Sequence, residues 1–248
     1  MRIYAIGDIH GHREKLVAAH ALIAADREAV GDDRSTVVHV GDLVDRGPDS
    51  RGVLNFLISG LDAGEPWVVL KGNHDRYLER FLSEGYVEDA ALRSGLPWFD
   101  YRLGGAETME SYGLKNVHGR RLKDLHEEAT EKVPGAHLDF LNSLPYWHKT
   151  QEVLFVHAGI KPGVPLGKQS EDDLIWIREP FLSDTRDHGW LVAHGHTPVD
   201  VVTHYGNHLD IDTGAGHGRA LSAVVIEGRD VWLLTKAGRV PIRPLQGG

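Results

Sequence analysis

The 248-residue sequence predicts an α/β fold in which a sheet is flanked by helices. Three times within the first 83 residues, a short apolar run leads into a loop rich in Gly, Asp and His, and apolar residues at helical spacing follow. The second half contains closely spaced apolar runs separated by turn residues, which is typical of strands. With 41% apolar and 25% charged residues, the composition is that of an ordinary globular protein, and the chain can bury a large core as one domain.

Composition and charge exclude several classes of protein. No apolar run approaches the roughly 18 residues of a membrane span, so no membrane association is expected. The sequence has no cysteine, which excludes disulfides, thiolate metal sites and a Cys nucleophile, and it favours a cytoplasmic location. The first residues enter a strand directly, so we expect no signal peptide. A net charge of -9 argues against a general nucleic-acid binder, whereas 16 histidines make an imidazole-rich metal site worth considering.

The first part of the chain consists of three strand–loop–helix units. The predicted strands are 2–6, 36–40 and 66–71, and the predicted helices are 12–27, 49–59 and 76–83. Repeated units of this kind form a parallel sheet with right-handed crossovers. Their three acidic loops then lie at the carboxyl ends of the strands, on one edge of the sheet, where open α/β sheets bind ligands.

Residues 84–150 have a different pattern, which we interpret as a helical insertion. Helices are expected at about 86–94, 105–112, 118–132 and 136–143. The apolar content is too sparse for a separate core, so we predict one domain over residues 1–243 and a flexible tail at 244–248. The aromatic side chains in this part are interpreted as packing residues: Trp98, Phe99, Tyr146 and Trp147.

The remaining residues predict strands joined by short turns. Strands are expected at 152–156, 190–193, 199–204, 208–212, 219–226 and 230–235, with a loop at 161–172 and a short ordered segment at 174–178. The close spacing of the strands predicts an antiparallel second sheet.

Five of the predicted strands are followed by residues of the types that commonly bind metals in proteins. The residues are Asp8 and His10, Asp42 and Asp45, Asn73, His74 and Asp75, His157, and finally His194 and His196. A single Gly-Asp after a strand is usually a turn or a helix cap, and a single His is usually a surface or core residue. Five independent loops of this kind are poorly explained in that way. The neighbouring glycines also let the backbone approach a ligand closely.

Five sequence motifs together resemble one family. The segments GDIHG at 7–11, GDLVDRG at 41–47, GNHD at 72–75, HAG at 157–159 and HGHT at 194–197 are similar to the signature of the phosphoprotein phosphatase branch of the calcineurin-like metallophosphoesterases. All five are present in the order of that family. The resemblance implies a β-sandwich of two mixed sheets flanked by helices, with a two-metal centre at one edge.

The resemblance also implies a ligand set. Asp8 and His10 would bind the first metal, Asp42 would bridge both metals, and Asn73, His157 and His196 would bind the second. Oxygen and nitrogen ligands without thiolate suit Mn²⁺, Fe or Zn²⁺ better than Ca²⁺, and two divalent transition-metal ions, with Mn²⁺ first, are expected. Because most of these ligands are neutral, two divalent cations would keep a net positive charge that attracts a phosphate dianion.

The reaction implied by the resemblance is direct hydrolysis by a hydroxide that bridges the two metals and attacks phosphorus in line. The resemblance makes His74 the general acid, and we expect His74 to lie too far along its loop to act as a ligand together with Asn73. Either Asp45 or Asp75 could hold its other ring nitrogen, and the family favours Asp45. Arg46 and Arg178 would clamp the phosphate. Arg178 rests on a looser similarity and is alternatively a surface residue in a salt bridge.

The leading hypothesis is a serine/threonine phosphoprotein phosphatase, or a broader phosphomonoesterase, acting on a phosphorylated protein or a small phosphate ester. The alternative is a dinucleoside polyphosphate hydrolase of the diadenosine tetraphosphate type. That branch typically replaces the second Asp of GDxxDRG, which is Asp45 here, and varies the HGHT motif. A non-catalytic scaffold is not favoured, because such proteins usually lose ligands and every expected ligand position is filled here. A nuclease is not favoured either, because it needs a basic track and none is visible in the sequence.

The loop 214–218 resembles a phosphate-binding loop in composition, but no helix follows it, so it is not a P-loop. We expect His217 or Arg219 to contact substrate.

Overall fold

The computed structural model describes residues 1–92 and 94–245. Within these residues, one sheet has six strands in the order β11-β10-β9-β1-β2-β3. Their bounds are β1 Arg2–Ile6, β2 Val37–His39, β3 Trp67–Val69, β9 Ala223–Glu227, β10 Asp230–Thr235 and β11 Gly238–Ile242. Strands β1, β2 and β3 are parallel, as the three strand–loop–helix units predict, while β9 to β11 run antiparallel.

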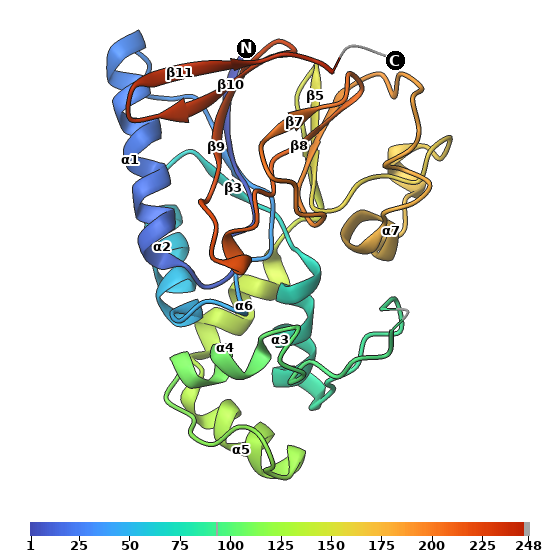
Figure 1. The fold of residues 1–248 in the computed structure, drawn as a ribbon. Helices are drawn as coiled ribbons and strands as arrows, with labels where there is room; N and C mark the ends of the chain where they lie inside the picture. The colour runs from blue at the N-terminus through green and yellow to red at the C-terminus, as the bar shows by residue number, and fades with distance from the viewer. Residues whose placement is uncertain (93, 246–248) are drawn as a thin grey trace.

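The second sheet of the described chain has five strands in the order β4-β5-β6-β8-β7. Their bounds are β4 Trp147–Lys149, β5 Val153–Val156, β6 Leu191–His194, β7 Thr203–His204 and β8 His208–Asp210. The three central strands are parallel and the two edge strands are antiparallel. Figure 1 shows the two sheets side by side, with helices on their outer faces and below them. The predicted sandwich of two mixed sheets flanked by helices is therefore confirmed.

Both faces of β1 are buried, and this explains its continuous apolar sequence. Ile3 and Ala5 face the second sheet, where they join a cluster that includes Phe155 and Leu209. Tyr4 and Ile6 belong to the cluster on the opposite face, under the helices. Strands covered on both faces are expected to be apolar throughout rather than alternating.

The helices extend the outer cluster of the first sheet downward. Their bounds are α1 Arg13–Val30, α2 Ser50–Asp62, α3 Asn73–Glu84, α4 Gly105–Ser111, α5 Leu122–Lys132 and α6 Gly135–Ser143. Buried side chains of all six helices belong to one cluster with the sheet. Helix α7 (Glu171–Trp176) covers the second sheet, and short 3₁₀ turns lie at η1 (Leu166–Lys168) and η2 (Ala215–His217).

Four predictions about these elements are wrong. Residues 86–92 and 94 contain no helix, and the predicted loop at 161–172 contains η1 and the start of α7. Helix α3 begins at Asn73 rather than Arg76, and the Asp75 carboxylate in its first turn accepts a hydrogen bond from the Gly72 amide. The second sheet is mixed rather than antiparallel, since β5, β6 and β8 pair in parallel, and strands β9 to β11 belong to the first sheet. Strands β4 and β11 were not predicted.

The chain end was predicted to be a flexible tail at 244–248. Of this tail, Leu245 donates its backbone N–H to the His204 carbonyl over 2.8 Å, and residues 246–248 lie outside the described residues. In the described part of the chain, no helix combines the length and apolar character that crossing a membrane requires.

Candidate active site

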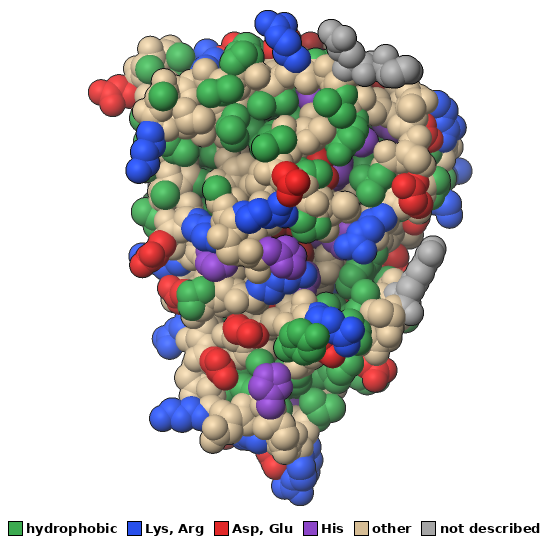
Figure 2. Space-filling view, in the orientation of Figure 1, with side chains coloured by type: hydrophobic (Ala, Val, Ile, Leu, Met, Phe, Trp, Pro, Cys, Tyr) green, Lys and Arg blue, Asp and Glu red, His purple; other side chains and the backbone are tan. Residues whose placement is uncertain are grey.

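The five predicted loops meet where the carboxyl ends of strands from both sheets come together. Asp42, after β2, lies 3.3 Å from the ring of His157, which follows β5, measured from Oδ1 to Nε2. Asp8, after β1, accepts a 2.9 Å hydrogen bond at Oδ2 from the backbone N–H of His196, which follows β6. Residues from separate ends of the sequence thus share one buried site. On the face shown in Figure 2, His, Lys and Arg side chains gather across the middle of the molecule.

The backbone of this site is unusual. Among the described residues, six that are not glycine have a positive φ, and five of them are His10, Asp42, Asp45, Arg46 and His196. Such conformations are unfavourable for L-residues and persist only where the surrounding structure enforces them, often at functional sites. The fold therefore holds these side chains at a cost in backbone strain, which core packing alone does not explain.

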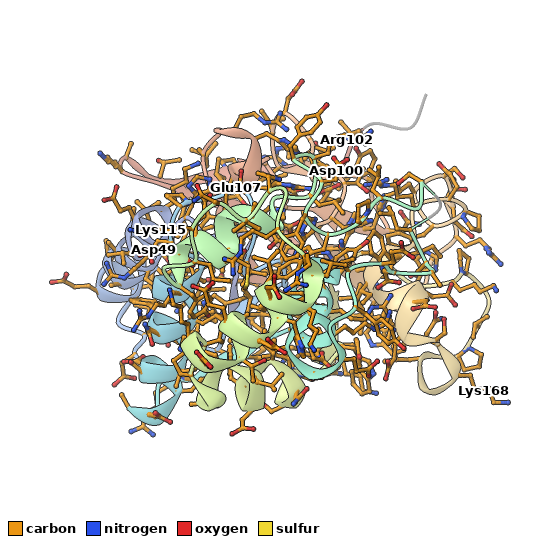
Figure 3. The ribbon with its side chains drawn as sticks, turned by 90° about the horizontal axis from the view of Figure 1, so that it is seen from below. Asp49, Asp100, Arg102, Glu107, Lys115 and Lys168 are labelled. Carbon is orange, nitrogen blue, oxygen red and sulfur yellow. The ribbon has the colours of Figure 1, made fainter. Side chains whose placement is uncertain are left out.

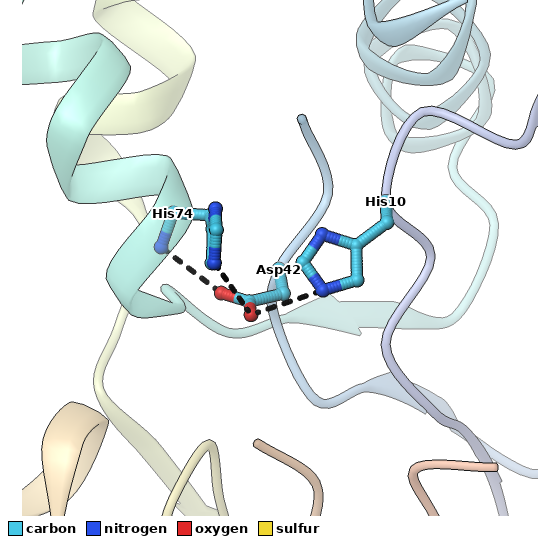
Figure 4. Close-up of side chains that lie close together, drawn as sticks. All are labelled: His10, Asp42 and His74. Carbon is cyan, nitrogen blue, oxygen red and sulfur yellow. Dashed lines mark hydrogen bonds and ion pairs between the residues drawn. The ribbon is translucent and has the colours of Figure 1, made fainter. Parts of the chain in front are cut away.

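Asp42 lies between two groups of potential metal ligands. One group is His10, Asp42 and His74, and the other is Asp42, His157 and His196. Its Oδ2 is 3.4 Å from Nε2 of His10 and 4.0 Å from Nε2 of His74, as Figure 4 shows. Its Oδ1 faces His157 instead. One carboxylate oxygen is thus directed at each group, which is the arrangement that a bridging ligand requires.

The ring nitrogens of His10 and His157 are oriented for metal binding. Each uses Nδ1 to contact a backbone carbonyl: His10 that of Val44 at 3.0 Å, and His157 that of Val40 at 2.9 Å. A carbonyl accepts, so each Nδ1 carries the proton and each Nε2 presents a lone pair to the site. This second hydrogen bond is the usual way in which a protein fixes a ligating imidazole.

The second group brings hydrogen-bond acceptors together. Oδ1 of Asn73 is 2.9 Å from Nε2 of His157 and 2.9 Å from Nδ1 of His196. Because Nε2 of His157 carries no proton, it and the amide oxygen face each other as two acceptors, with an Asp42 oxygen also near. Nε2 of His196 is buried without a partner in the described residues. Converging acceptors of this kind repel one another unless a cation lies among them, so these residues fit a metal.

The carboxylates point to the same conclusion. Burial raises the pKa of Asp8 well above its ordinary range, and the nearby charges of Asp212 and Asp42 act in the same direction. Oδ1 of Asp8 is buried and has no hydrogen-bond partner among the described residues. A divalent cation beside these groups would reverse the direction of the shift. The site thus concentrates buried negative charge that a cation would stabilise.

His74 and Asp45 form a buried pair at the edge of this site. Nδ1 of His74 lies 2.6 Å from Oδ2 of Asp45, so the family-based choice of Asp45 over Asp75 agrees with the geometry. Nε2 of His74 faces the site, 3.2 Å from the guanidinium of Arg46. Burial lowers the pKa of His74 to about 3 and raises that of Asp45 to about 7. In both cases burial disfavours the charged form of the side chain.

Nε2 of His74 belongs to the first group of potential ligands, together with His10 and Asp42, and this group does not include Asn73. Asp75 is directed away from the site. Its carboxylate accepts backbone hydrogen bonds from Leu43 at 2.9 Å and Gly72 at 2.8 Å, and it thereby ties the second and third loops together.

The two predicted phosphate clamps differ in position. Nη1 of Arg46 reaches Nε2 of His10 at 2.7 Å, so this guanidinium lies inside the site. Arg178 is exposed and lies two residues after Trp176, whose ring centroid is 5.8 Å from that of His196. In residues 1–92 and 94–245, Arg178 forms no ion pair, so the alternative of a surface salt bridge has no support there.

The loop at 214–218 is held beside the site. Lys15 donates hydrogen bonds to the carbonyls of Ala215 and Arg219, at 3.0 and 2.7 Å. Arg219 itself pairs with the exposed Asp200 at 2.6 Å, which uses its guanidinium outside the site. His217 is exposed, and the charge of Arg46 acts on its pKa.

Sequence reasoning missed three residues near the site. Asp212 lies two residues after β8 and two before a glycine, and its charge acts on the pKa of Asp8. A carboxylate near a glycine after a strand is the same kind of signal that identified the other loops. Trp98 and Thr108 both donate hydrogen bonds to Asp45, at 2.8 and 2.6 Å. No local signal identifies them, because each is more than 50 residues away from Asp45 in the chain.

The chain combines a sandwich of two mixed sheets with a buried cluster of His, Asp and Asn side chains at the strand ends. The family model described as calcineurin-like phosphoesterase matches residues 1–217. The chain belongs to this family, and it is a hydrolytic enzyme of the metal-dependent phosphoesterase type.

Relatives within the family differ in named function. The chain is 27% identical over 247 residues to the asymmetrical bis(5'-nucleosyl)-tetraphosphatase PrpE of Oceanobacillus iheyensis, covering 90% of this chain and 88% of the relative. It is 28% identical over 237 residues to serine/threonine-protein phosphatase 1 of Salmonella typhimurium, covering 91% of this chain and 92% of the relative. The crystal structure of a cold-active protein-tyrosine phosphatase from a Shewanella species has the same fold, with a TM-score of 0.64 and 16% sequence identity. The match covers 98% of this chain and 80% of the phosphatase chain.

Proposed function

We propose that the protein belongs to the phosphoprotein phosphatase branch and is a metal-dependent phosphomonoester hydrolase acting on phosphorylated serine or threonine. The observation that carries this proposal is the pair of Asp45 and His74, joined at 2.6 Å, with Nε2 of His74 turned toward Asp42 and Arg46. A monoester releases an oxygen that must gain a proton, and this pair is placed to supply it.

Six residues would hold two divalent transition-metal ions, of which Mn²⁺ is the first choice. They are Asp8, His10, Asp42, Asn73, His157 and His196, with Asp42 shared between the ions. When bound, such ions lower the pKa of a water molecule toward neutrality and offset the charge of a phosphate group. Asp8 and Asp42 supply the anionic ligands, and the neutral ligands leave positive charge for the substrate.

Arg46 would bind the phosphate. Its guanidinium lies between His10 and His74 and can pair with two phosphate oxygens at once. Arg178, at the exposed side of the site, would add a second positive charge for the outer phosphate oxygens. In the reaction, a water molecule that has given one proton to solvent forms a bond from its oxygen to phosphorus while the bond to the ester oxygen breaks. His74 gives the proton on Nε2 to that leaving oxygen, and phosphate and an alcohol are the products.

The acid role requires His74 to be protonated on Nε2 in the complex with substrate. Burial opposes this in the free site, since it lowers the pKa of His74 to about 3, although the charge of Asp42 acts in the opposite direction. A phosphate dianion next to Nε2 adds a further negative charge and raises the pKa of the imidazole. Asp45 stabilises the resulting imidazolium through Nδ1.

A dinucleoside polyphosphate hydrolase is the second candidate function. The similarity to PrpE favours it. A groove of about 790 Å³ next to the site could also accept a group larger than phosphate, and it is lined in part by Lys161, Trp176 and Arg178. The presence of Asp45 favours the phosphomonoester reaction.

The test is a comparison of kcat/KM for a phosphoserine peptide, p-nitrophenyl phosphate and diadenosine tetraphosphate, with the same Mn²⁺-loaded preparation. The proposal expects the phosphopeptide to have a kcat/KM at least roughly 10-fold above that of the dinucleotide. A dinucleotide value that exceeds both monoesters by a similar factor would replace the leading proposal with the second candidate.

A further inference from the structure

The carboxylate of Asp45 is held by the helical insertion as well as by its own loop. Nε1 of Trp98 donates a hydrogen bond to Oδ2 at 2.8 Å, and the hydroxyl of Thr108 donates one to Oδ1 at 2.6 Å. Trp98, Thr108 and Asp45 are all fully buried. Oδ2 is the same oxygen that contacts Nδ1 of His74. Both oxygens of this carboxylate therefore have fixed partners, and one partner is His74.

The backbone of the Asp45 turn is held by the same elements. The Asp45 amide donates to the Thr108 hydroxyl at 2.9 Å and to the Ser50 hydroxyl at 3.1 Å. The next amide, that of Arg46, donates to the carbonyl of Gly104 at 3.2 Å. Asp45 and Arg46 have positive φ values of 74° and 66°, so these contacts stabilise a conformation that the turn would not adopt alone.

The indole of Trp98 has little freedom to move. A Cβ on Gly105, at the start of α4, would lie 2.6 Å from the indole ring, so the helix packs directly on it. The ring also lies against Phe81 of α3 and Phe99, with centroid distances of 5.3 and 4.9 Å. The loop that connects Trp98 to α4 carries the ion pair of Asp100 and Arg102 at its outer edge, as Figure 3 shows. The donor to Asp45 is therefore rigidly placed.

We propose that Trp98 and Thr108 are positioning residues for proton transfer: they fix the Asp45 carboxylate, and through it the direction in which His74 presents Nε2. This inference rests on the acid role proposed above for His74. It gives the insertion a part in the chemistry, because two of its residues complete the hydrogen-bonding of the Asp45 and His74 pair. An insertion that only shaped the substrate surface would not need these contacts.

A positioning role predicts an effect that depends on the leaving group. An alkyl phosphate such as phosphoserine releases an alkoxide, which needs a proton, whereas p-nitrophenolate is stable without one. Trp98→Phe removes the N–H donor but keeps an aromatic ring, and Thr108→Val removes the hydroxyl at similar volume. Each change should lower kcat for the phosphoserine peptide by roughly 10- to 100-fold, the size expected for losing a hydrogen bond to a charged group. The loss on p-nitrophenyl phosphate should be at least about fivefold smaller.

Matched variants separate positioning from packing. Met109→Leu changes a fully buried side chain of the same helix α4 without touching Asp45, and it should leave the ratio of the two rates unchanged. Thr108→Ser keeps the hydroxyl and should restore most of the activity that Thr108→Val loses. Thermal melting of each variant reports whether it is folded. Thr108→Val carries the test if Trp98→Phe does not fold.

The double variants give the decisive result. In a His74→Asn background there is no acid to position, so adding Trp98→Phe or Thr108→Val should lower kcat by less than about twofold further. Full additivity, or an equal loss on both substrates in the single variants, would overturn the positioning role while leaving His74 as the acid. If His74→Asn itself showed no dependence on the leaving group, the acid role would fall and this inference with it.

Discussion

Replacing Gly195 with alanine should disturb the metal centre through one contact. Gly195 lies in the turn between His194 and His196, and its φ is not in the left-handed region, so the backbone tolerates alanine there. A Cβ at this position would lie 1.9 Å from Oδ1 of Asp8. Asp8 is proposed as a ligand of the first metal, and Oδ1 is its oxygen without a hydrogen-bond partner in the described chain.

The size of the effect follows from this distance. Contacts of a Cβ below 3.0 Å are essentially never found, so the Asp8 carboxylate or the turn must move by about 1 Å. Ligand distances in a working metal site are held within about 0.2 Å, so a shift of this size should weaken the affinity for one metal by at least roughly 10-fold. A misplacement of about 1 Å in an active site also costs on the order of 10² in kcat.

The assay is equilibrium dialysis of the metal-free protein against Mn²⁺, with metal content and kcat measured on the same samples. Gly167→Ala is the matched control, because a Cβ there meets nothing within 4 Å. It should behave as the wild type. Two metals bound to Gly195→Ala with wild-type affinity would refute the assignment of Asp8 as a ligand.

Three further changes test other parts of the site and the fold. His74→Asn should retain both metals but lower kcat for the phosphoserine peptide by roughly 10²–10⁴-fold. An unchanged kcat for this substrate would remove His74 from the mechanism. Asp42→Asn should reduce both metal content and activity, whereas a full complement of two metals would contradict a bridging role. Burial alone would raise the pKa of Asp26, but hydrogen bonds from Arg239 and Tyr4 lower it below its ordinary value. The ionised carboxylate therefore stabilises the protein at neutral pH, and this contribution is lost as the pH falls through the lowered pKa. Asp26→Asn should thus destabilise the protein at pH 7 more than at pH 3 in thermal melting, and an equal effect at both would count against the ion pair.

The central strands could be predicted from the sequence because burial on both faces produces continuous apolar runs. Pairing between distant strands could not. The run that became β9 pairs antiparallel with β1, with Ile3 opposite Ile226, and nothing within the run specifies this partner. The close spacing of the last strands therefore predicts a second antiparallel sheet, but β9 to β11 belong to the first sheet. Parallel pairing of β5, β6 and β8 was missed for the same reason.

A helix is predicted at 86–94, and its absence from the described residues 86–92 and 94 shows how a tertiary contact outweighs local pattern. Asp89 accepts hydrogen bonds from Nε and Nη2 of Arg76 at 2.8 and 2.9 Å, and both side chains are buried. Asp89 also accepts the Ala91 amide in a local turn. This buried ion pair ties the segment to α3. The partner of Asp89 cannot be identified from the residues around it.

The candidate site was more predictable than its support. Each loop carried its own signal of Gly with Asp, Asn or His after an apolar run, and parallel strands bring such loops to one edge. The contacts of Trp98 and Thr108 with Asp45 depend on how the insertion folds back over α2 and α3. Such contacts leave no local sequence pattern, so the sequence identifies Trp98 only as a packing residue.

We propose that a single centre hydrolyses phosphate esters and that it holds two metal ions, with Asp42 as a ligand of both. The most direct test of this proposal is a titration of the metal-free protein with Mn²⁺, following bound metal and hydrolysis of p-nitrophenyl phosphate in the same samples. We predict that activity rises until two Mn²⁺ are bound per chain and then stays constant. Full activity in the metal-free protein, or a maximum at one bound ion, would contradict this account.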